Sequence, residues 1–245
     1  ATVCLAGSFV LSALLTAIVR KMSLRSNFVA HPTADRYHRT TVPLGGGAAI
    51  FVTLAAFILA AAVTVKFIAA PGHLNWLGPS ATIHIPGFLG KINQLIIILL
   101  CAAALFVLGF WDDKQRLGPV FKLIVQFAVA IIAAAFADVR IEFFIESRII
   151  TSALSAVWIV LIINAFNFLD NMDGASAGIA VITSGILFVA AALSGQVFVG
   201  GLALVFIGTL LGFLAFNFPP ASIFMGDAGS LVIGFFVALL TVRTT

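Results

Sequence analysis

Eight long apolar runs are the feature that most constrains the fold of this chain. They cover residues 2–19, 47–70, 92–111, 119–137, 149–169, 174–194, 196–216 and 228–243. A single helix needs about 20 mostly apolar residues to cross a bilayer, and each run comes close to that length. A transmembrane barrel would instead show segments of about 10 residues with alternating polarity. The sequence therefore predicts an all-α, polytopic transmembrane bundle of about eight spans.

The composition excludes an ordinary soluble domain. Of the 245 residues, 62% are hydrophobic and 9% are charged, whereas soluble domains carry about 25% charged residues. The net charge of +4 is small, and the clustering of the basic residues beside the apolar runs is typical of membrane orientation and not of nucleic-acid binding. Cys4 and Cys101 lie inside apolar runs, without the spacing of a disulfide framework or a zinc site. We expect one integral membrane domain over residues 1–245.

The segments between the runs fall into two groups with different charge. Most of the basic residues outside the runs lie in 20–46, 112–118, 170–173 and 217–227, and fewer lie in 71–91, 138–148 and the turn near Gly195. The positive-inside rule puts the first group in the cytoplasm and the N-terminus outside. Most acidic residues belong to the same group: Asp35, Asp112, Asp113, Asp170, Asp173 and Asp227. The sequence therefore predicts that the polar motifs converge on the cytoplasmic face.

A ladder of polar residues ends one of the apolar runs. Asn164, Asn167, Asp170 and Asp173 follow one another at a spacing of three and stop at Gly174. Residues three apart are neighbours on one helix face, so the spacing predicts a polar face at the end of a span. Carboxylates at the edge of a bilayer are costly unless a cation or a substrate offsets them, which indicates a functional site. The alternative is that Asn and Asp serve here as cap and turn residues.

Two adjacent carboxylates follow another run. Asp112 and Asp113 precede a group of basic residues, Lys114, Arg116 and Lys122. Mg²⁺ prefers oxygen ligands and often binds through one or two carboxylates together with substrate phosphates, which the basic residues could hold. The alternative is a solvated interfacial cluster in which these charges neutralise one another.

Two glycine-containing segments complete the candidate motifs. Asp227 lies where the last run begins, after Pro219-Pro220. It could cap the following helix, or it could bind a metal beside a helix N-terminus, where phosphate is also favoured. Gly45-Gly46-Gly47, next to a basic loop, could present backbone N–H groups to phosphate or could simply end that loop.

Taken together, these motifs resemble the polyprenyl-phosphate N-acetylhexosamine-1-phosphate transferases, glycosyltransferase family 4. The resemblance rests on Asp112-Asp113 with Lys122 and Gln126, on residues 164–174, and on residues 217–230, which include Phe-Met-Gly-Asp-Ala-Gly-Ser. His38 and residues 42–46 are more similar to the branch that transfers GlcNAc-1-phosphate to undecaprenyl phosphate than to the peptidoglycan lipid I translocase. The chain departs from the family pattern at Ala30, Thr33, Asp35 and Asn171.

The resemblance implies transfer of a sugar-1-phosphate, with GlcNAc-1-phosphate expected, from a UDP-N-acetylhexosamine to polyprenyl (undecaprenyl) phosphate. UMP would be released, and the reaction would initiate a cell-envelope polysaccharide such as lipopolysaccharide. The expected cofactor is Mg²⁺, or Mn²⁺ in its place. The expected location is the bacterial plasma membrane, with the active site on the cytoplasmic face, and a homodimer is one assembly open to such a protein.

The resemblance also implies roles for particular residues. Asp112 would act as the base on the lipid phosphate or, as the alternative, as a nucleophile, and Asp113 would support it or bind the metal. The metal would be held by Asp227, Asp113 and Asn167. The substrate would be bound by Asn167, Asp170, Asp173, Lys122, Asn217 and His38.

Two other classes of protein stay open on the sequence. A cation-coupled transporter would carry its acidic residues near the bilayer midplane. An inactive membrane scaffold would keep the fold without the chemistry. Members of the resembled family continue through further helices and a His-containing loop, whereas this chain begins without Met and stops at Thr245. We therefore expect a chain that is truncated at both ends.

Overall fold

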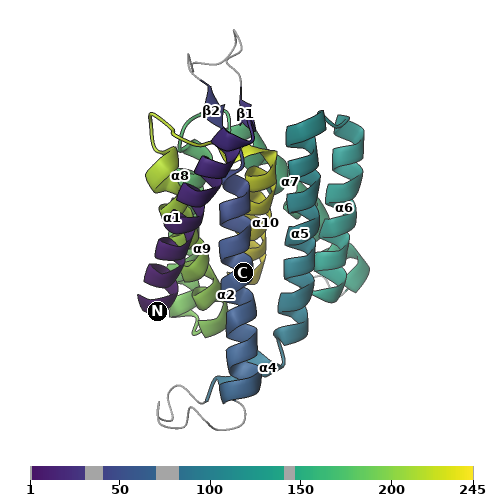
Figure 1. The fold of residues 1–245 in the computed structure, drawn as a ribbon. Helices are drawn as coiled ribbons and strands as arrows, with labels where there is room; N and C mark the ends of the chain where they lie inside the picture. The colour runs from purple at the N-terminus through teal and green to yellow at the C-terminus, as the bar shows by residue number, and fades with distance from the viewer. Residues whose placement is uncertain (1, 31–40, 70–82, 141–146, 245) are drawn as a thin grey trace.

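The fold is a bundle of long helices that run along a common direction (Figure 1). The computed structural model describes residues 2–30, 41–69, 83–140 and 147–244. Within these residues, eight helices are long and apolar enough to cross a membrane, which confirms the predicted class of fold. They are α1 (Thr2–Arg25), α2 (Gly46–Thr64) with its π-helical extension η1 (Val65–Ala69), α5 (Ile92–Gln115), α6 (Pro119–Phe136), α7 (Arg148–Leu169), α8 (Ala175–Leu193), α9 (Val197–Asn217) and α10 (Gly226–Thr244).

Three short elements lie at the two ends of the bundle. The strands β1 (Val29–Ala30) and β2 (Val42–Pro43) pair antiparallel at one end, with Ala30 opposite Val42. The helix α4 (Ile85–Leu89) lies at the opposite end (Figure 1). The sequence did not predict these elements, because two residues of strand and five of helix are too short to produce a periodic pattern.

Helix α10 occupies the centre of the bundle. It packs against α2, α5, α7, α8 and α9, and a larger share of it is buried than of any other span. Close packing is possible because glycines remove side chains at the crossings. A Cβ on Gly47 would overlap the backbone of Gly229, and a Cβ on Gly109 would overlap the backbone of Asp227. Small residues at helix contacts are the usual means by which membrane helices approach closely.

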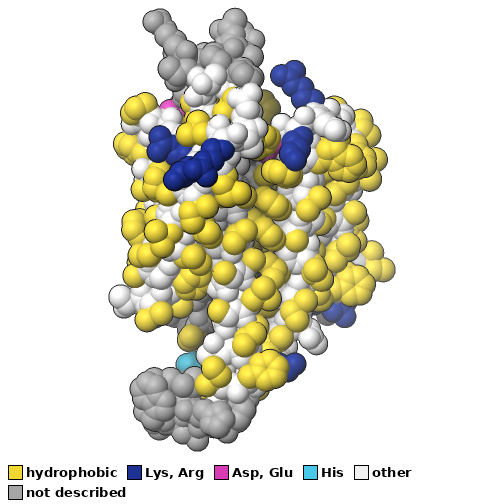
Figure 2. Space-filling view, viewed as in Figure 1, with side chains coloured by type: hydrophobic (Ala, Val, Ile, Leu, Met, Phe, Trp, Pro, Cys, Tyr) yellow, Lys and Arg dark blue, Asp and Glu magenta, His cyan; other side chains and the backbone are white. Residues whose placement is uncertain are grey.

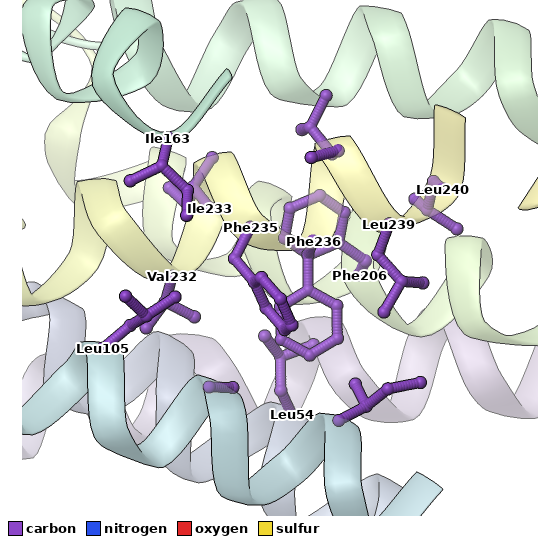
Figure 3. Packing of buried hydrophobic residues seen from close by; sticks show 14 of the residues in the cluster. Leu54, Leu105, Ile163, Phe206, Val232, Ile233, Phe235, Phe236, Leu239 and Leu240 are labelled. Atoms are coloured by element: carbon purple, nitrogen blue, oxygen red, sulfur yellow. The ribbon is translucent and has the colours of Figure 1, made fainter. Parts of the chain in front are cut away.

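Large apolar side chains fill the space around α10 beyond these crossings. Phe206 of α9 stacks on Phe236 of α10 with ring centroids 5.5 Å apart, and Phe235 packs edge-on against Phe236. Figure 3 shows these rings between Leu54, Leu105 and Ile163, which come from three other helices. All of these side chains are buried, so the core fixes the position of α10.

The outer face of the bundle is apolar over most of its length. Figure 2 shows a broad belt of hydrophobic side chains, with Lys and Arg gathered toward the two ends. Exposed members of the belt come from several helices and include Leu100, Phe136, Ile182 and Ile186. Such a surface is suited to contact with lipid tails, and the chain is accordingly an integral membrane protein.

Two motifs differ from the prediction in their local structure, although α7 ends at Leu169, where the predicted apolar run also ends. Helix α5 continues through Gln115, so Asp112 and Asp113 lie in its last turns and not in a loop. Helix α7 ends at Leu169, and Gly174 adopts a left-handed conformation with φ of 68° before α8. The prediction of one helical face over residues 164–173 was therefore wrong beyond Leu169, because Asp170 ends the helix and Asp173 lies in the following turn.

Candidate functional site

A cavity of about 450 Å³ opens at one end of the bundle. It lies where α5, α7 and α9 end and where α8 and α10 begin. Residues from all the acidic motifs line it, so the structure brings these motifs together as predicted. The lining comprises Ala30, Leu44, Asp112, Asp113, Arg116, Asn167, Asp170, Asn171, Met172, Asp173, Asn217, Phe224, Gly226 and Asp227.

Two carboxylates from distant parts of the chain meet at one ammonium group. Lys122 Nζ lies 2.7 Å from Asp112 Oδ2 and 3.0 Å from Asp227 Oδ2. The side chains are 21% exposed for Lys122, 12% for Asp112 and 28% for Asp227, so the cluster is partly shielded from water. Both carboxylates line the cavity, whereas Lys122 lies outside its lining. In this arrangement the single charge of Lys122 offsets part of the negative charge of the two carboxylates and aligns them.

The first turn of α6 places Lys122 in this position. Pro119 occupies the start of α6, where its missing N–H group costs nothing. Asp112 Oδ1 accepts a hydrogen bond from the backbone N–H of Leu117, which closes the short turn between α5 and α6. The same carboxylate therefore both fixes this turn and contacts the lysine that follows it.

Asp113 caps a helix to which it does not belong. Its Oδ1 accepts the backbone N–H of Asp227 at 2.8 Å, and its Oδ2 accepts that of Ala228 at 3.2 Å. These are N–H groups of the first turn of α10, which have no partner inside that helix. Gly226, with φ of 71°, leaves room for the carboxylate. The cap at this helix is Asp113 and not Asp227, whose own carboxylate is turned to Lys122.

The two asparagines of α7 serve different contacts. Asn167 lines the cavity, and its Nδ2 donates to Ser230 Oγ at 2.9 Å. Asn164, one turn earlier, donates from Nδ2 to Gln126 Oε1 at 2.6 Å and lies outside the cavity lining. Asn164 and Gln126 thus form a polar link between α7 and α6, and only Asn167 belongs to the site.

Hydrogen bonds join the two loops that form one wall of the cavity. Asn217 Oδ1 accepts the N–H of Gly174 at 3.1 Å, and its Nδ2 donates to the carbonyl of Ile223 at 2.9 Å. Asp173 Oδ2 accepts the N–H of Ala221 at 2.9 Å. The side chains at 173 and 217 therefore hold the wall together, and Asp170, at the end of α7, faces the same cavity.

We expect replacement of Asn217 by Ala to loosen this wall. The change leaves the partly buried N–H of Gly174 and the buried carbonyl of Ile223 without their partner, at a cost of about 1–3 kcal/mol. The melting temperature of the detergent-solubilised protein should fall. Asn171→Ala is the matched control, because Asn171 is exposed and, among the described residues, its side chain bonds only the nearby carbonyl of Phe168. Equal melting temperatures for the two variants would contradict the prediction.

Two expectations for the first loop have different outcomes. His38 lies outside the described residues, and so does the loop segment 31–40 that contains it. The N–H groups of Gly46 and Gly47 donate to the carbonyls of Phe224 and Met225. Of the two interpretations left open for these glycines, the phosphate cradle is not supported at Gly46 and Gly47, because their N–H groups join the start of α2 to the segment before α10.

The donor atoms at the cavity fit a metal ion whose remaining ligands come from water and a substrate. Among the described residues, no group of three or more His, Cys, Asp or Glu side chains is arranged to hold a metal ion. Asp227 and Asn167 nonetheless bring a carboxylate and an amide to one cavity. Mg²⁺ keeps several waters and often takes one or two carboxylates with substrate phosphates. A closed protein cage is not needed for such an ion.

Some residues that line the cavity could not be identified as functional from the sequence. Phe224 and Met172 face the cavity from the two loops, and apolar loop residues give no separate signal of function. The one indication in the sequence that they belong to the site was their position in the segments that also contain Asp227 and Asp170.

The fold and the cavity define a polytopic helical membrane protein with a shared acidic site at one end of its spans. The family model described as Glycosyl transferase family 4 matches residues 95–245. The chain belongs to this family.

Three relatives illustrate the similarity. A probable undecaprenyl-phosphate N-acetylglucosaminyl 1-phosphate transferase of Bacillus subtilis is 31% identical, over 93% of this chain and 58% of its own length. An undecaprenyl-phosphate alpha-N-acetylglucosaminyl 1-phosphate transferase of Thermotoga maritima is 27% identical, over 95% and 62%. A phospho-N-acetylmuramoyl-pentapeptide-transferase of Staphylococcus carnosus is 30% identical, over 63% and 55%. The chain thus spans somewhat more than half the length of these relatives.

Proposed function

We propose that this chain forms the catalytic part of an enzyme that transfers GlcNAc-1-phosphate from UDP-GlcNAc to undecaprenyl phosphate, with release of UMP. The observation that carries the proposal is the meeting of Asp112 and Asp227 at Lys122, in a cavity at the end of the spans. The names of the relatives support the choice of sugar and lipid. The reaction would initiate the synthesis of a cell-envelope polysaccharide.

The position of the cavity suits the meeting of a lipid and a soluble substrate. The acceptor lies in the membrane and a nucleotide sugar arrives from water, so the reaction needs a site at the boundary between them. We place this boundary at the cytoplasmic face of the bacterial plasma membrane, which the distribution of Lys and Arg in the sequence supports.

The proposed reaction exchanges one phosphoanhydride bond for another. An oxygen of the lipid phosphate attacks the phosphorus that carries the sugar, and the bond from that phosphorus to the bridging oxygen breaks, so that UMP leaves with the electron pair. Asp112 faces the cavity and takes the proton if the lipid phosphate carries one. Two anionic substrates must approach each other, so cationic groups have to offset their repulsion. Arg116 in the lining supplies one of these charges.

The remaining residues position these groups. Lys122 holds Asp112 and Asp227 side by side. Asp113 fixes the first turn of α10 and with it the place of Asp227. Asp170, Asp173 and Asn217 shape the wall on which we place the nucleotide sugar, and of these Asp173 and Asn217 act through the loop hydrogen bonds.

We assign a Mg²⁺ ion to Asp227 and Asn167. When bound, the ion would neutralise negative charge on the transferred phosphate. Asp113 is a weaker candidate ligand than the sequence suggested, because both of its oxygens accept backbone N–H groups.

The positions of the carboxylates favour a transferase over a cation-coupled transporter. Asp112 and Asp113 lie at the end of α5, and Asp227 lies in the first turn of α10. An ion pathway would place such groups near the middle of the spans. The described acidic residues of the cavity instead lie at helix ends on one side of the bundle.

A direct assay tests the proposal. The protein at its natural full length, in detergent with undecaprenyl phosphate, Mg²⁺ and UDP-GlcNAc labelled in the sugar, should yield a labelled lipid and an equal amount of UMP. Omission of the lipid or addition of a chelator should stop both products. If neither UMP nor labelled lipid is produced under these conditions, an inactive membrane scaffold becomes the better interpretation. UDP-GalNAc in parallel tests the choice of sugar.

A further inference from the structure

A second cavity lies at the end of the bundle opposite the acidic site. Its volume is about 650 Å³, within the range of about 300–1,000 Å³ that is usual for ligand sites. It is bounded by the last turns of α2 and α10, the first turns of α5 and α9, and the short helix α4. Most of its lining is apolar and includes Phe57, Phe88, Leu202 and Val205.

The charged groups in this second cavity are all basic. Lys91, Arg243 and His84 line it, whereas no Asp or Glu belongs to the described lining. The Lys91 ammonium lies 5.2 Å from the centre of the Phe198 ring, which holds it beside the apolar wall. Arg243 donates to Gln94 Oε1 and to the carbonyl of Ala137, so its guanidinium is fixed. Two positioned cations, Lys91 and Arg243, beside an apolar wall are complementary to an anionic amphiphile.

A buried acceptor in the same cavity lacks a partner. Gln196 precedes α9 and lines the cavity, and its Oε1 is buried without a hydrogen bond in the part of the chain that the structure describes. A buried polar atom without a partner is costly. If the Gln196 amide rotates toward the cavity, a ligand that carries a hydroxyl group near its negative charge satisfies this oxygen.

We propose that this cavity binds an anionic glycerophospholipid, with its phosphodiester between Lys91 and Arg243 and its acyl chains along α2 and α9. The site lies at the level where lipid head groups meet the ends of the spans. Phosphatidylglycerol has the required features, namely one negative charge, head-group hydroxyls for Gln196, and two hydrocarbon chains. Polyprenyl phosphate bound here would hold its phosphate at the opposite end of the spans from Asp112, so this site is separate from the acceptor site. The inference does not depend on the proposed reaction.

Native mass spectrometry of the delipidated protein tests the charge requirement. The probes are phosphatidylglycerol and phosphatidylcholine with the same acyl chains. We expect phosphatidylglycerol to bind more tightly, and Lys91→Gln to weaken its binding about fivefold, since one cation near a membrane surface contributes about 1 kcal/mol. Lys66→Gln is the matched control, because Lys66 is an exposed cation of η1 outside the lining. Equal binding of the two lipids, or equal losses in the two variants, would overturn the proposal.

A second variant tests the apolar wall without changing any charge. Gly201 lines the cavity, and a Cβ there would meet no atom within 4 Å, so Gly201→Leu should fill the space and weaken phosphatidylglycerol about tenfold. Gly185→Leu is the control, because Gly185 is equally open but lies on α8 outside the lining. Glycerol phosphate, which has no acyl chains, should not compete. Full competition by glycerol phosphate, or tighter binding of undecaprenyl phosphate than of phosphatidylglycerol at this site, would refute the assignment to a glycerophospholipid.

Discussion

Replacement of Asp227 by Asn is expected to lower the rate of sugar-phosphate transfer about 10²–10³-fold, the usual cost of removing one electrostatic group from a reaction centre. The amide has nearly the shape of the carboxylate, and its oxygen can still accept from Lys122. The variant should therefore fold, while the charge that faces the cavity is lost. The measurement is the rate of UMP release at saturating UDP-GlcNAc, together with the melting temperature in detergent.

The matched control for this change is Asp138→Asn. Asp138 also pairs with a cation, Arg140, at 2.8 Å, but it follows α6 at the other end of the bundle. Its backbone has a positive φ of 56°, a conformation that Asn tolerates. This control should keep full activity. An Asp227→Asn protein that transfers sugar phosphate as fast as the control would remove Asp227 from the reaction.

Replacement of Gly109 by Ala is expected to destabilise the bundle by about 1–3 kcal/mol, or more, because the added methyl group overlaps backbone atoms. The Cβ would collide with the carbonyl of Asp227 and the nitrogen of Ala228. Backbone atoms cannot rotate away, so α5 and α10 must separate. The separation also moves Asp227 relative to Asp112, and transfer activity should fall together with the melting temperature.

The same change at Gly185 should not destabilise the protein. Gly185 lies within α8, and a Cβ there would meet nothing within 4 Å. Ala is favoured over Gly inside a helix by about 1 kcal/mol, so Gly185→Ala should leave the melting temperature unchanged or raise it. Equal losses of stability in Gly109→Ala and Gly185→Ala would contradict the claim that Gly109 is needed for the close approach of α5 to α10.

The spans and the convergence of the motifs could be predicted from the sequence for a simple physical reason. An apolar run of sufficient length has few alternatives to a membrane helix, and successive spans return the chain to alternate ends. Counting spans therefore places Asp112, Asp173 and Asp227 at the same end, where the cavity lies.

The contacts within the site could not be predicted in the same way. Spacing along one helix gives the face on which a residue lies, but not which helix packs against that face. Asp113 was expected to support catalysis or bind metal, and its capping of α10 depends on the crossing at Gly109. Lys122 was expected to face phosphate, and the structure turns it to two carboxylates. The polar residues at a spacing of three, 164 to 173, do not share one helix face, because α7 ends at Leu169 and a turn follows.

The central position of α10 has a consequence for how the protein is made. Among the eight described spans, α10 is the last to leave the ribosome, yet it contacts most of the others. Until it is inserted, the other spans lack the helix against which most of them pack. Before that step Asp112 and Lys122 can already form their ion pair, but Asp227 cannot yet join it. Asp113 likewise lacks the backbone N–H groups of α10 from which it accepts hydrogen bonds. The acidic cavity is therefore completed only when α10 enters the membrane, so a partly synthesised chain has no assembled site.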